Sequence, residues 1–209
     1  MEHSDFKTDP IPGLPELLPA GEEILWRGRP QAWRLAVEAM WLNWVIGYFA
    51  VLAVWRAALS ATQMPLGAAL LTAVPLVVLG LVVTGLIYGM AYLQARATIY
   101  TLTSARVVMR IGAVLNLTVN LPFTRMAAAH LTKRRDGSGT IVFETVAETR
   151  MSAFMLWPHI RPWHLRRPQP ALRCIPEVAD VAELLADATD TVFSEPKISS
   201  APVPEGVAA

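Results

Sequence analysis

The sequence predicts an α+β membrane protein in which a hairpin of two transmembrane helices precedes an antiparallel β domain capped by a C-terminal helix. Three observations lead to this fold class. The hydrophobic stretch from Ala39 to Ala95 contains a single charged residue, Arg56. After Arg96 the apolar residues change to the alternating spacing that is typical of strands. An apolar stripe at helical spacing then follows Pro176.

Residues 1–35 form an N-terminal leader that is expected on the cytoplasmic side of the membrane. Most of the leader lacks regularly spaced apolar residues, but Ile24–Trp26 is a short strand-like element. This element either adds to the edge of a sheet or lies at the membrane surface with Trp26 and Trp33 inserted. Trp26 and Arg27 are therefore candidates for contact with the membrane surface or with a partner.

The hydrophobic stretch is long enough for two spans, because a hydrocarbon core of about 30 Å requires roughly 20 apolar residues per helix. We assign residues 36–95 to the hairpin, with spans at about 37–55 and 66–93. A polar link is expected to break the helix between the spans, and Pro75 is expected to kink the second span. The residues of the link are Arg56, Ser60, Thr62, Gln63, Met64 and Pro65.

Basic residues flank both ends of the hairpin, whereas the link contains only Arg56. By the positive-inside rule, both termini should then face the cytoplasm. The basic residues beside the spans are Arg27, Arg29 and Arg34 before the first span and Arg96, Arg106 and Arg110 after the second.

Charge is unevenly distributed along the chain, although the formal net charge is only +1. Residues 96–176 contain twelve Lys and Arg against three Asp and Glu, a net charge of +9, and residues 177–209 have a net charge of −6. A basic domain beside a bilayer attracts anionic headgroups, each near-surface charge contributing about 1 kcal/mol. Positive-inside bias alone would produce the same pattern. Nucleic-acid binding is not expected, since the basic residues lie beside a membrane and the acidic tail competes for them.

Residues 96–193 are expected to form a cytoplasmic β domain, and residues 194–209 a disordered tail without a core. The clearest strand pattern alternates Leu115, Leu117, Val119 and Leu121 with polar residues. The expected strands cover residues 97–103, 106–111, 115–121, 126–132, 140–144 and 171–175. A helix is expected to begin at Pro176 and to cap the sheet with Val178, Val181, Ala182, Leu184, Leu185 and Ala188.

The segment from Trp157 to Pro170 is the candidate partner-binding surface. It concentrates Trp and Arg, the residue types that dominate protein interaction hot spots. The alternative is that its tryptophans pack on the sheet and its arginines are solvated. The candidate partner-binding residues are Trp157, Arg161, Trp163, Arg166 and Arg167.

Two further features are candidate contacts. The basic turn of Lys133, Arg134 and Arg135 is a candidate contact for lipid headgroups or for the acidic surface of a partner. The alternative is that the turn is simply solvated. Gly85 and Gly89 form a G-x-x-x-G pair, with Gly80 above them in the same span, which lets two helices approach closely. This pair either supports a homodimer or packs against the first span of the same chain.

The sequence offers little support for catalysis or for a metal site. It contains no glycine-rich phosphate loop and no H-E-x-x-H motif, so no enzymatic activity is expected. His159 and His164 lack Cys or acidic partners at metal-ligand spacing, so no metal is expected. Cys174 is expected to be a small buried residue rather than a nucleophile.

Three features resemble bacterial membrane proteins that carry a pleckstrin-homology-like domain: residues Glu22–Pro30, the two-span hairpin and residues Tyr100–Gly112. Within that group, three further stretches are similar to the PuhB family of photosynthetic complex assembly proteins of purple bacteria. These stretches are Asn120–Phe123, Leu156–His164 and Pro170–Pro176, and the resemblance covers about residues 18–188.

The resemblance implies a pleckstrin-homology-like β domain on a protein of the bacterial inner membrane, cytoplasmic or intracytoplasmic. It implies a non-enzymatic factor that assists assembly of the photosynthetic reaction centre. The expected partners are reaction-centre subunits, core light-harvesting components and membrane lipids. No resident cofactor is expected, and only transient contact with bacteriochlorophyll, because the spans contain no histidine and Asn43 offers only a weak ligand. The alternative is a general membrane-anchored module that binds lipid or scaffolds another membrane complex.

Overall fold

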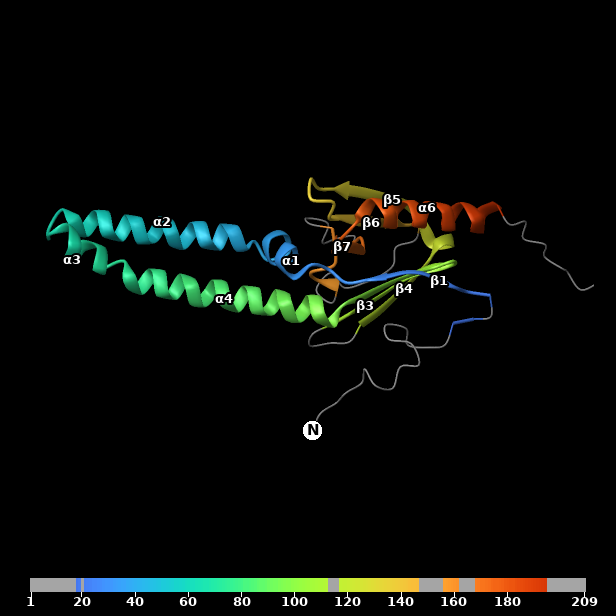
Figure 1. Ribbon diagram of the computed structural model, residues 1–209, viewed down its shortest axis with the longest axis horizontal. Helices are drawn as coiled ribbons and strands as arrows, with labels where there is room; N and C mark the ends of the chain where they lie inside the picture. Colours follow the sequence, from blue (N-terminus) through green and yellow to red (C-terminus); the bar gives the residue numbers. More distant parts are fainter. Residues whose placement is uncertain (1–17, 20, 113–116, 147–155, 162–167, 195–209) are drawn as a thin grey trace, which may run out of the picture.

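The computed structural model describes residues 18–19, 21–112, 117–146, 156–161 and 168–194. Within these ranges, helices form an elongated hairpin that projects from one end of a β domain (Figure 1). The β domain contains two antiparallel sheets and a C-terminal helix that packs against both of them.

The hairpin contains two helical segments, residues 42–61 and 66–97, that are long and apolar enough to cross a membrane. In the most apolar 18-residue stretch of each segment, only 6% and 11% of the residues are buried within the chain. The side chains of both segments are therefore not covered by a protein core. This agrees with the predicted two-span hairpin. The helices are α1 (Ala32–Ala39), α2 (Leu42–Ala61), α3 (Leu66–Leu71) and α4 (Val74–Ala97).

The first span differs from the prediction at both ends. α1 and α2 are separate helices, because Trp41 between them adopts a left-handed conformation with φ 58° and ψ 33°. α2 then continues to Ala61, so Arg56 and Ser60 belong to the helix and not to the link. The alanine-rich sequence around Arg56 favours helix. The Ser60 hydroxyl lies 3.0 Å from the Thr72 hydroxyl, which satisfies it without breaking the helix.

The second span is interrupted close to Pro75, where a kink is predicted. α3 ends at Leu71 and α4 begins at Val74, so Pro75 lies in the first turn of α4, where its missing N–H costs no hydrogen bond. The predicted kink is therefore a break between two helices. α4 continues to Ala97, beyond the predicted end of the span at residue 93.

α2 and α4 approach each other closely at Gly80. A Cβ atom added to Gly80 would lie 2.9 Å from the Cβ of Phe49 on α2, closer than real Cβ atoms come. Cβ atoms added to Gly85 or Gly89 would meet nothing within 4 Å. Packing of the glycines against the first span is therefore confirmed at Gly80 but not at Gly85 and Gly89, which are open on the surface of α4.

The first sheet has the strand order β1-β2-β3-β4, with β1 at Ile24–Gly28 and β2 at Ile99–Thr103. β1 precedes the hairpin and β2 follows it, yet they pair antiparallel, with Trp26 opposite Leu102. Of the two alternatives for the Ile24–Trp26 element, the sheet edge is thus the correct one. The boundary predicted at residue 35 does not coincide with that of the β domain, because the leader contributes a strand.

The other strands follow the predicted order. β3 and β7 occupy the predicted residues. In β4, Val119 and Leu121 are buried while Thr118 and Asn120 are exposed, as the alternation predicts; Leu115 lies outside the described residues. The second sheet has the order β5-β6-β7. The remaining strands are β3 (Arg106–Ile111), β4 (Leu117–Pro122), β5 (Met126–Lys133), β6 (Gly139–Thr145) and β7 (Ala171–Ile175), and a 3-10 helix at Phe123–Arg125 links the sheets.

The C-terminal helix α6 spans Val178–Ser194 and begins later than predicted. Glu177 has a φ of 48°, so neither it nor Pro176 is helical. Leu184 is 37% exposed, contrary to the predicted stripe. The rest of the stripe packs against both sheets in one core, which includes Val178, Val181, Leu185 and Ala188 with Tyr100, Phe123 and Phe143.

Replacing Gly80 by Leu should destabilise the hairpin, because the added side chain has to displace Phe49 or separate α2 from α4. Overpacking of this kind typically costs about 1–3 kcal/mol. We expect a lower midpoint of thermal unfolding for the purified protein in detergent, followed by circular dichroism. Gly85→Leu is the matched control, since the same side chain has open space there. Equal destabilisation by both variants would contradict the close approach at Gly80.

Candidate functional site

The hairpin and the β domain meet at the short helix α1. Its Leu35 and Ala39 are buried against Ala95 of α4 and Cys174 of β7. The Gln31 backbone N–H, just before α1, donates to the Cys174 carbonyl oxygen at 2.8 Å. Cys174 is buried, as predicted, and burial raises the pKa of its thiol to about 12. α1 is thus held between the hairpin and the second sheet.

α1 also binds the turn between β5 and β6 through two ion pairs. Arg34 pairs with Asp136, and the Arg134 Nε donates to Glu38 Oε1 at 2.6 Å. Hydrogen bonding from the Ser138 hydroxyl and from Arg34 lowers the pKa of the Asp136 carboxyl, so this group stays ionised. Arg134 is therefore paired with Glu38, while its side chain remains 44% exposed, and its contact with headgroups or a partner stays a prediction.

The other predicted membrane-surface residues lie in different environments. Trp26 is partly buried against the core, because β1 adds to the sheet, so its predicted place at the membrane surface is wrong. Arg27 is exposed on β1. Lys133 at the end of β5 and Arg135 in the turn are exposed as well. The turn therefore keeps two exposed cations besides Arg134, which is paired with Glu38.

An apolar groove of about 590 Å³ lies where the hairpin meets the β domain. It is formed by the end of α1 and the break after it, by α4, and by the loop that precedes β7. Trp41 and Trp157 line it and are 47% and 43% exposed. Met40 and Met90, whose flexible side chains adapt to varied partners, also line it, as do Ala39, Leu86 and Ile87. Exposed tryptophans beside methionines suit the binding of an apolar segment of another protein.

The predicted partner-binding residues are only partly brought together. Trp157 lines the groove, so the alternative that it packs on the sheet is wrong. Arg161 is half-buried and donates to Gln169 Oε1 at 3.1 Å, and the Gln169 amide donates to Glu144 at 3.0 Å. Arg161 is therefore engaged within the β domain. Trp163, Arg166 and Arg167 lie outside the described residues.

A buried polar network that sequence reasoning missed holds residues 156–161, which precede β7 and include Trp157. His159 is fully buried, with Nδ1 2.5 Å from the Tyr100 hydroxyl and Nε2 3.2 Å from the Thr98 hydroxyl. The Arg173 backbone N–H donates to the Tyr100 hydroxyl at 3.3 Å, and its guanidinium donates to the Pro158 carbonyl oxygen at 3.0 Å. Burial and the charge of Arg173 lower the pKa of His159 to about 3, so the ring is neutral. The histidine and its hydroxyl partners are 59 and 61 residues apart, so no local pattern indicates them.

The structure shows no arrangement typical of a metal centre in the part of the chain that it describes. Within those ranges, no three His, Cys, Asp or Glu side chains are grouped so that they could hold a metal ion. The polar network around His159 joins the segment that carries Trp157 to Thr98, Tyr100 and Arg173.

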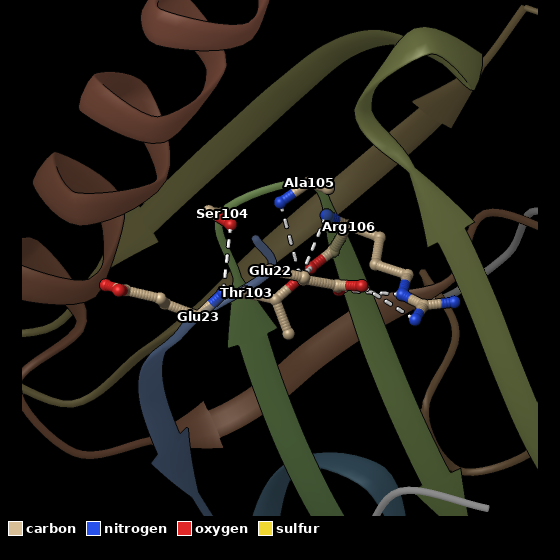
Figure 2. Close-up of polar contacts among 6 residues, drawn as sticks. All are labelled: Glu22, Glu23, Thr103, Ser104, Ala105 and Arg106. Carbon is tan, nitrogen blue, oxygen red and sulfur yellow. Dashed lines mark hydrogen bonds and ion pairs between the residues drawn. The ribbon is translucent and has the colours of Figure 1, made fainter. Parts of the chain in front are cut away.

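Figure 2 shows the cluster that joins the start of β1 to the turn between β2 and β3. The Glu22 carboxylate accepts hydrogen bonds from Arg106 Nε and Nη2, both at 2.8 Å, and from the Thr103 hydroxyl at 2.6 Å. Although burial opposes it, this hydrogen bonding lowers the pKa of Glu22. The Glu23 N–H donates to Ser104 Oγ at 3.2 Å, while the Glu23 side chain points away from the cluster. Glu22 therefore secures β1 at the edge of the first sheet.

Comparison with known proteins finds a family and a relative that cover most of the chain. Residues 35–189 match the family described as "Bacterial PH domain". A protein of Rhodobacter capsulatus, described as an uncharacterized 23.7 kDa protein in the puhA 5′ region, is 46% identical over 204 residues. The match covers 97% of this chain and 95% of that protein. No solved structure matches significantly.

Glu22→Gln should destabilise the β domain by about 1–3 kcal/mol, because it leaves the Arg106 guanidinium without its carboxylate partner. The free energy of unfolding, from denaturant titration of the purified protein, measures this change. Glu23→Gln removes a carboxylate that points away from the cluster and should change stability by less than about 0.5 kcal/mol. Similar losses for the two variants would rule out the role assigned to Glu22.

Stability should fall as the pH drops below the ordinary histidine pKa of 6.5, because His159 is neutral in the folded protein and its folded pKa is about 3. Between these values the unfolded chain binds the extra proton, so acid favours unfolding over that window. From pH 6.5 to pH 5 the wild type should lose about 1.6 kcal/mol more than His159→Gln. Urea titrations at each pH test this, with exposed His130→Gln as the control. Equal pH slopes for wild type and His159→Gln would contradict it.

Proposed function

Because this chain belongs to the bacterial PH domain family and resembles a protein encoded in the 5′ region of puhA, we propose that it assists assembly of the photosynthetic reaction centre. The near full-length similarity to that protein is the observation that carries the proposal, since puhA is the reaction-centre H gene. Neighbouring bacterial genes often serve one complex. The chain would then be one of the PuhB assembly proteins, with a non-enzymatic role.

In this proposal, residues 42–61 and 66–97 cross the bacterial inner membrane, cytoplasmic or intracytoplasmic, and both termini lie in the cytoplasm. The length, apolar composition and exposed side chains of the two segments support a membrane location. The basic residues beside the outer ends of the hairpin support the orientation. The β domain then stands at the cytoplasmic surface of the membrane.

The groove lined by Trp41 and Trp157 is the proposed contact for a newly inserted reaction-centre subunit. With the hairpin in the membrane, this groove lies at the cytoplasmic surface, where an apolar segment of a neighbouring membrane protein can reach it. α1 is held by α4, by β7 and by the β5–β6 turn, so the two sides of the groove keep their spacing. A preformed site of this kind lowers the entropic cost of binding. It would hold the subunit until pigments and partners are in place.

The other expected partners fit the same proposal. Core light-harvesting components would use the same apolar surface. Contact with bacteriochlorophyll would be transient, because neither candidate span contains a histidine. Gly85 and Gly89, open on α4, would permit a homodimer.

Deletion of the gene in its host tests the assembly role. We expect isolated membranes to lose the near-infrared absorption of the reaction centre while the reaction-centre genes are still transcribed, because unassisted subunits fail to accumulate. Complementation with the wild-type gene should restore the absorption. Wild-type absorption in the deletion strain would overturn the assembly role and favour a general module that binds lipid or scaffolds another membrane complex.

Complementation with Trp157→Ala tests the groove. Truncation of a hot-spot tryptophan costs about 2 kcal/mol or more, so we expect several-fold lower reaction-centre absorption at equal protein level. Phe193→Ala is the control, because it removes a 64% exposed aromatic side chain on α6, which does not line the groove. Full restoration by Trp157→Ala would exclude the groove as the contact but leave the assembly role standing.

A further inference from the structure

We propose that the β5–β6 turn binds the headgroups of anionic phospholipids through Lys133 and Arg135. This binding is independent of the reaction-centre role. It requires only that the hairpin lies in a membrane.

The turn lies at the end of the β domain that faces the hairpin, next to α1 (Figure 1). Two ion pairs with α1 hold it there, one between Arg34 and Asp136 and the other between Arg134 and Glu38. Directly after α1, the chain enters the first candidate span at Leu42. The turn is therefore attached to the residues from which the chain enters the membrane.

Exposed aromatic rings on α1 and α4 are typical of a membrane surface. Trp33 on α1 and Tyr88 on α4 are 55% and 41% exposed, and their ring centroids lie 6.1 Å apart. Trp and Tyr are enriched where a membrane meets water. Arg34, which follows Trp33 in the chain, pairs with Asp136 of the turn. The aromatic pair and the turn are thus joined through adjacent residues of α1.

Ion pairing leaves the turn with a net positive charge. The acids Asp136 and Glu38 are each paired with an arginine. Lys133 and Arg135 are exposed, and neither forms an ion pair with another residue in the described ranges. Two such cations at the membrane surface attract the phosphate groups of anionic lipids.

The composition of the turn favours a lipid headgroup over a protein partner. Residues 133–138 are Lys, Arg, Arg, Asp, Gly and Ser, so the turn lacks the apolar or aromatic anchor that a protein hot spot requires. Headgroup binding needs only positive charge and hydrogen-bond donors, which Lys and Arg supply. The apolar groove that suits a protein partner is built from other segments.

Binding of dioctanoyl phosphatidylglycerol to the purified full-length protein in neutral detergent, measured by microscale thermophoresis, tests the proposal. Each near-surface charge contributes about 1 kcal/mol, which corresponds to about a fivefold change in Kd. We expect Lys133→Gln and Arg135→Gln each to weaken binding about fivefold, and the double variant about 25-fold. Dioctanoyl phosphatidylcholine, which carries no net charge, should bind the wild-type protein only weakly. Its affinity should be no higher than that of the double variant for dioctanoyl phosphatidylglycerol.

Arg125→Gln is the matched control, because this exposed arginine precedes β5, about 25 Å from the turn by the rise of the strand. Arg125→Gln should change the affinity for phosphatidylglycerol less than twofold. A second control, the double variant Lys133→Arg with Arg135→Lys, keeps both positive charges and should preserve binding. Unchanged affinity in the double glutamine variant, or equal weakening by Arg125→Gln, would overturn the proposal. If the double glutamine variant lost reaction-centre accumulation in the host but kept its affinity for phosphatidylglycerol, the turn would be a protein contact. That result would also overturn the lipid proposal.

Discussion

The pairing of β1 with β2 is the constraint on which the rest of the structure depends. β1 ends at Gly28 and β2 begins at Ile99, so the whole hairpin lies between two neighbouring strands. Neighbouring strands are about 5 Å apart, which forces the hairpin to leave the sheet and return to it at adjacent points. Glu22 and Arg106 secure the far end of the same strand pair. The orientation of the hairpin on the β domain thus begins with a short sheet contact.

α1 converts this contact into a fixed junction. Its apolar face packs on α4 and β7, and its Arg34 and Glu38 pair with the β5–β6 turn. On the other side of the groove, buried His159 ties the loop of Trp157 to the first sheet through Tyr100. Burial of a neutral imidazole with hydroxyl partners on both nitrogens avoids the cost of an unpaired polar group. The groove therefore exists only when hairpin and β domain are both in place.

The two proposed binding surfaces lie close together but differ in chemistry. The groove presents Trp41 and Trp157 and suits an apolar segment of a membrane protein. The β5–β6 turn presents Lys133 and Arg135 and suits headgroups. A domain fixed to lipid beside its protein-binding groove would meet a membrane-embedded partner in one orientation. The fold itself does not select a partner, because one fold supports many functions; the proposal of the reaction centre comes from the similarity to a protein from the puhA 5′ region.

The sequence by itself determined the two candidate spans, the positions of β3 and β7, the alternation in β4 and the burial of Cys174. Each of these follows from hydropathy and periodicity within a few neighbouring residues. Helix ends were predicted less well, because they depend on single-residue conformations such as the positive φ of Trp41 and Glu177. Only the tertiary structure decided that Gly80 and not Gly85 packs the hairpin, that Arg134 pairs with Glu38, and that a groove brings Trp41 to Trp157. These features join residues far apart in the chain, and a local pattern carries no information about which distant residue becomes the partner.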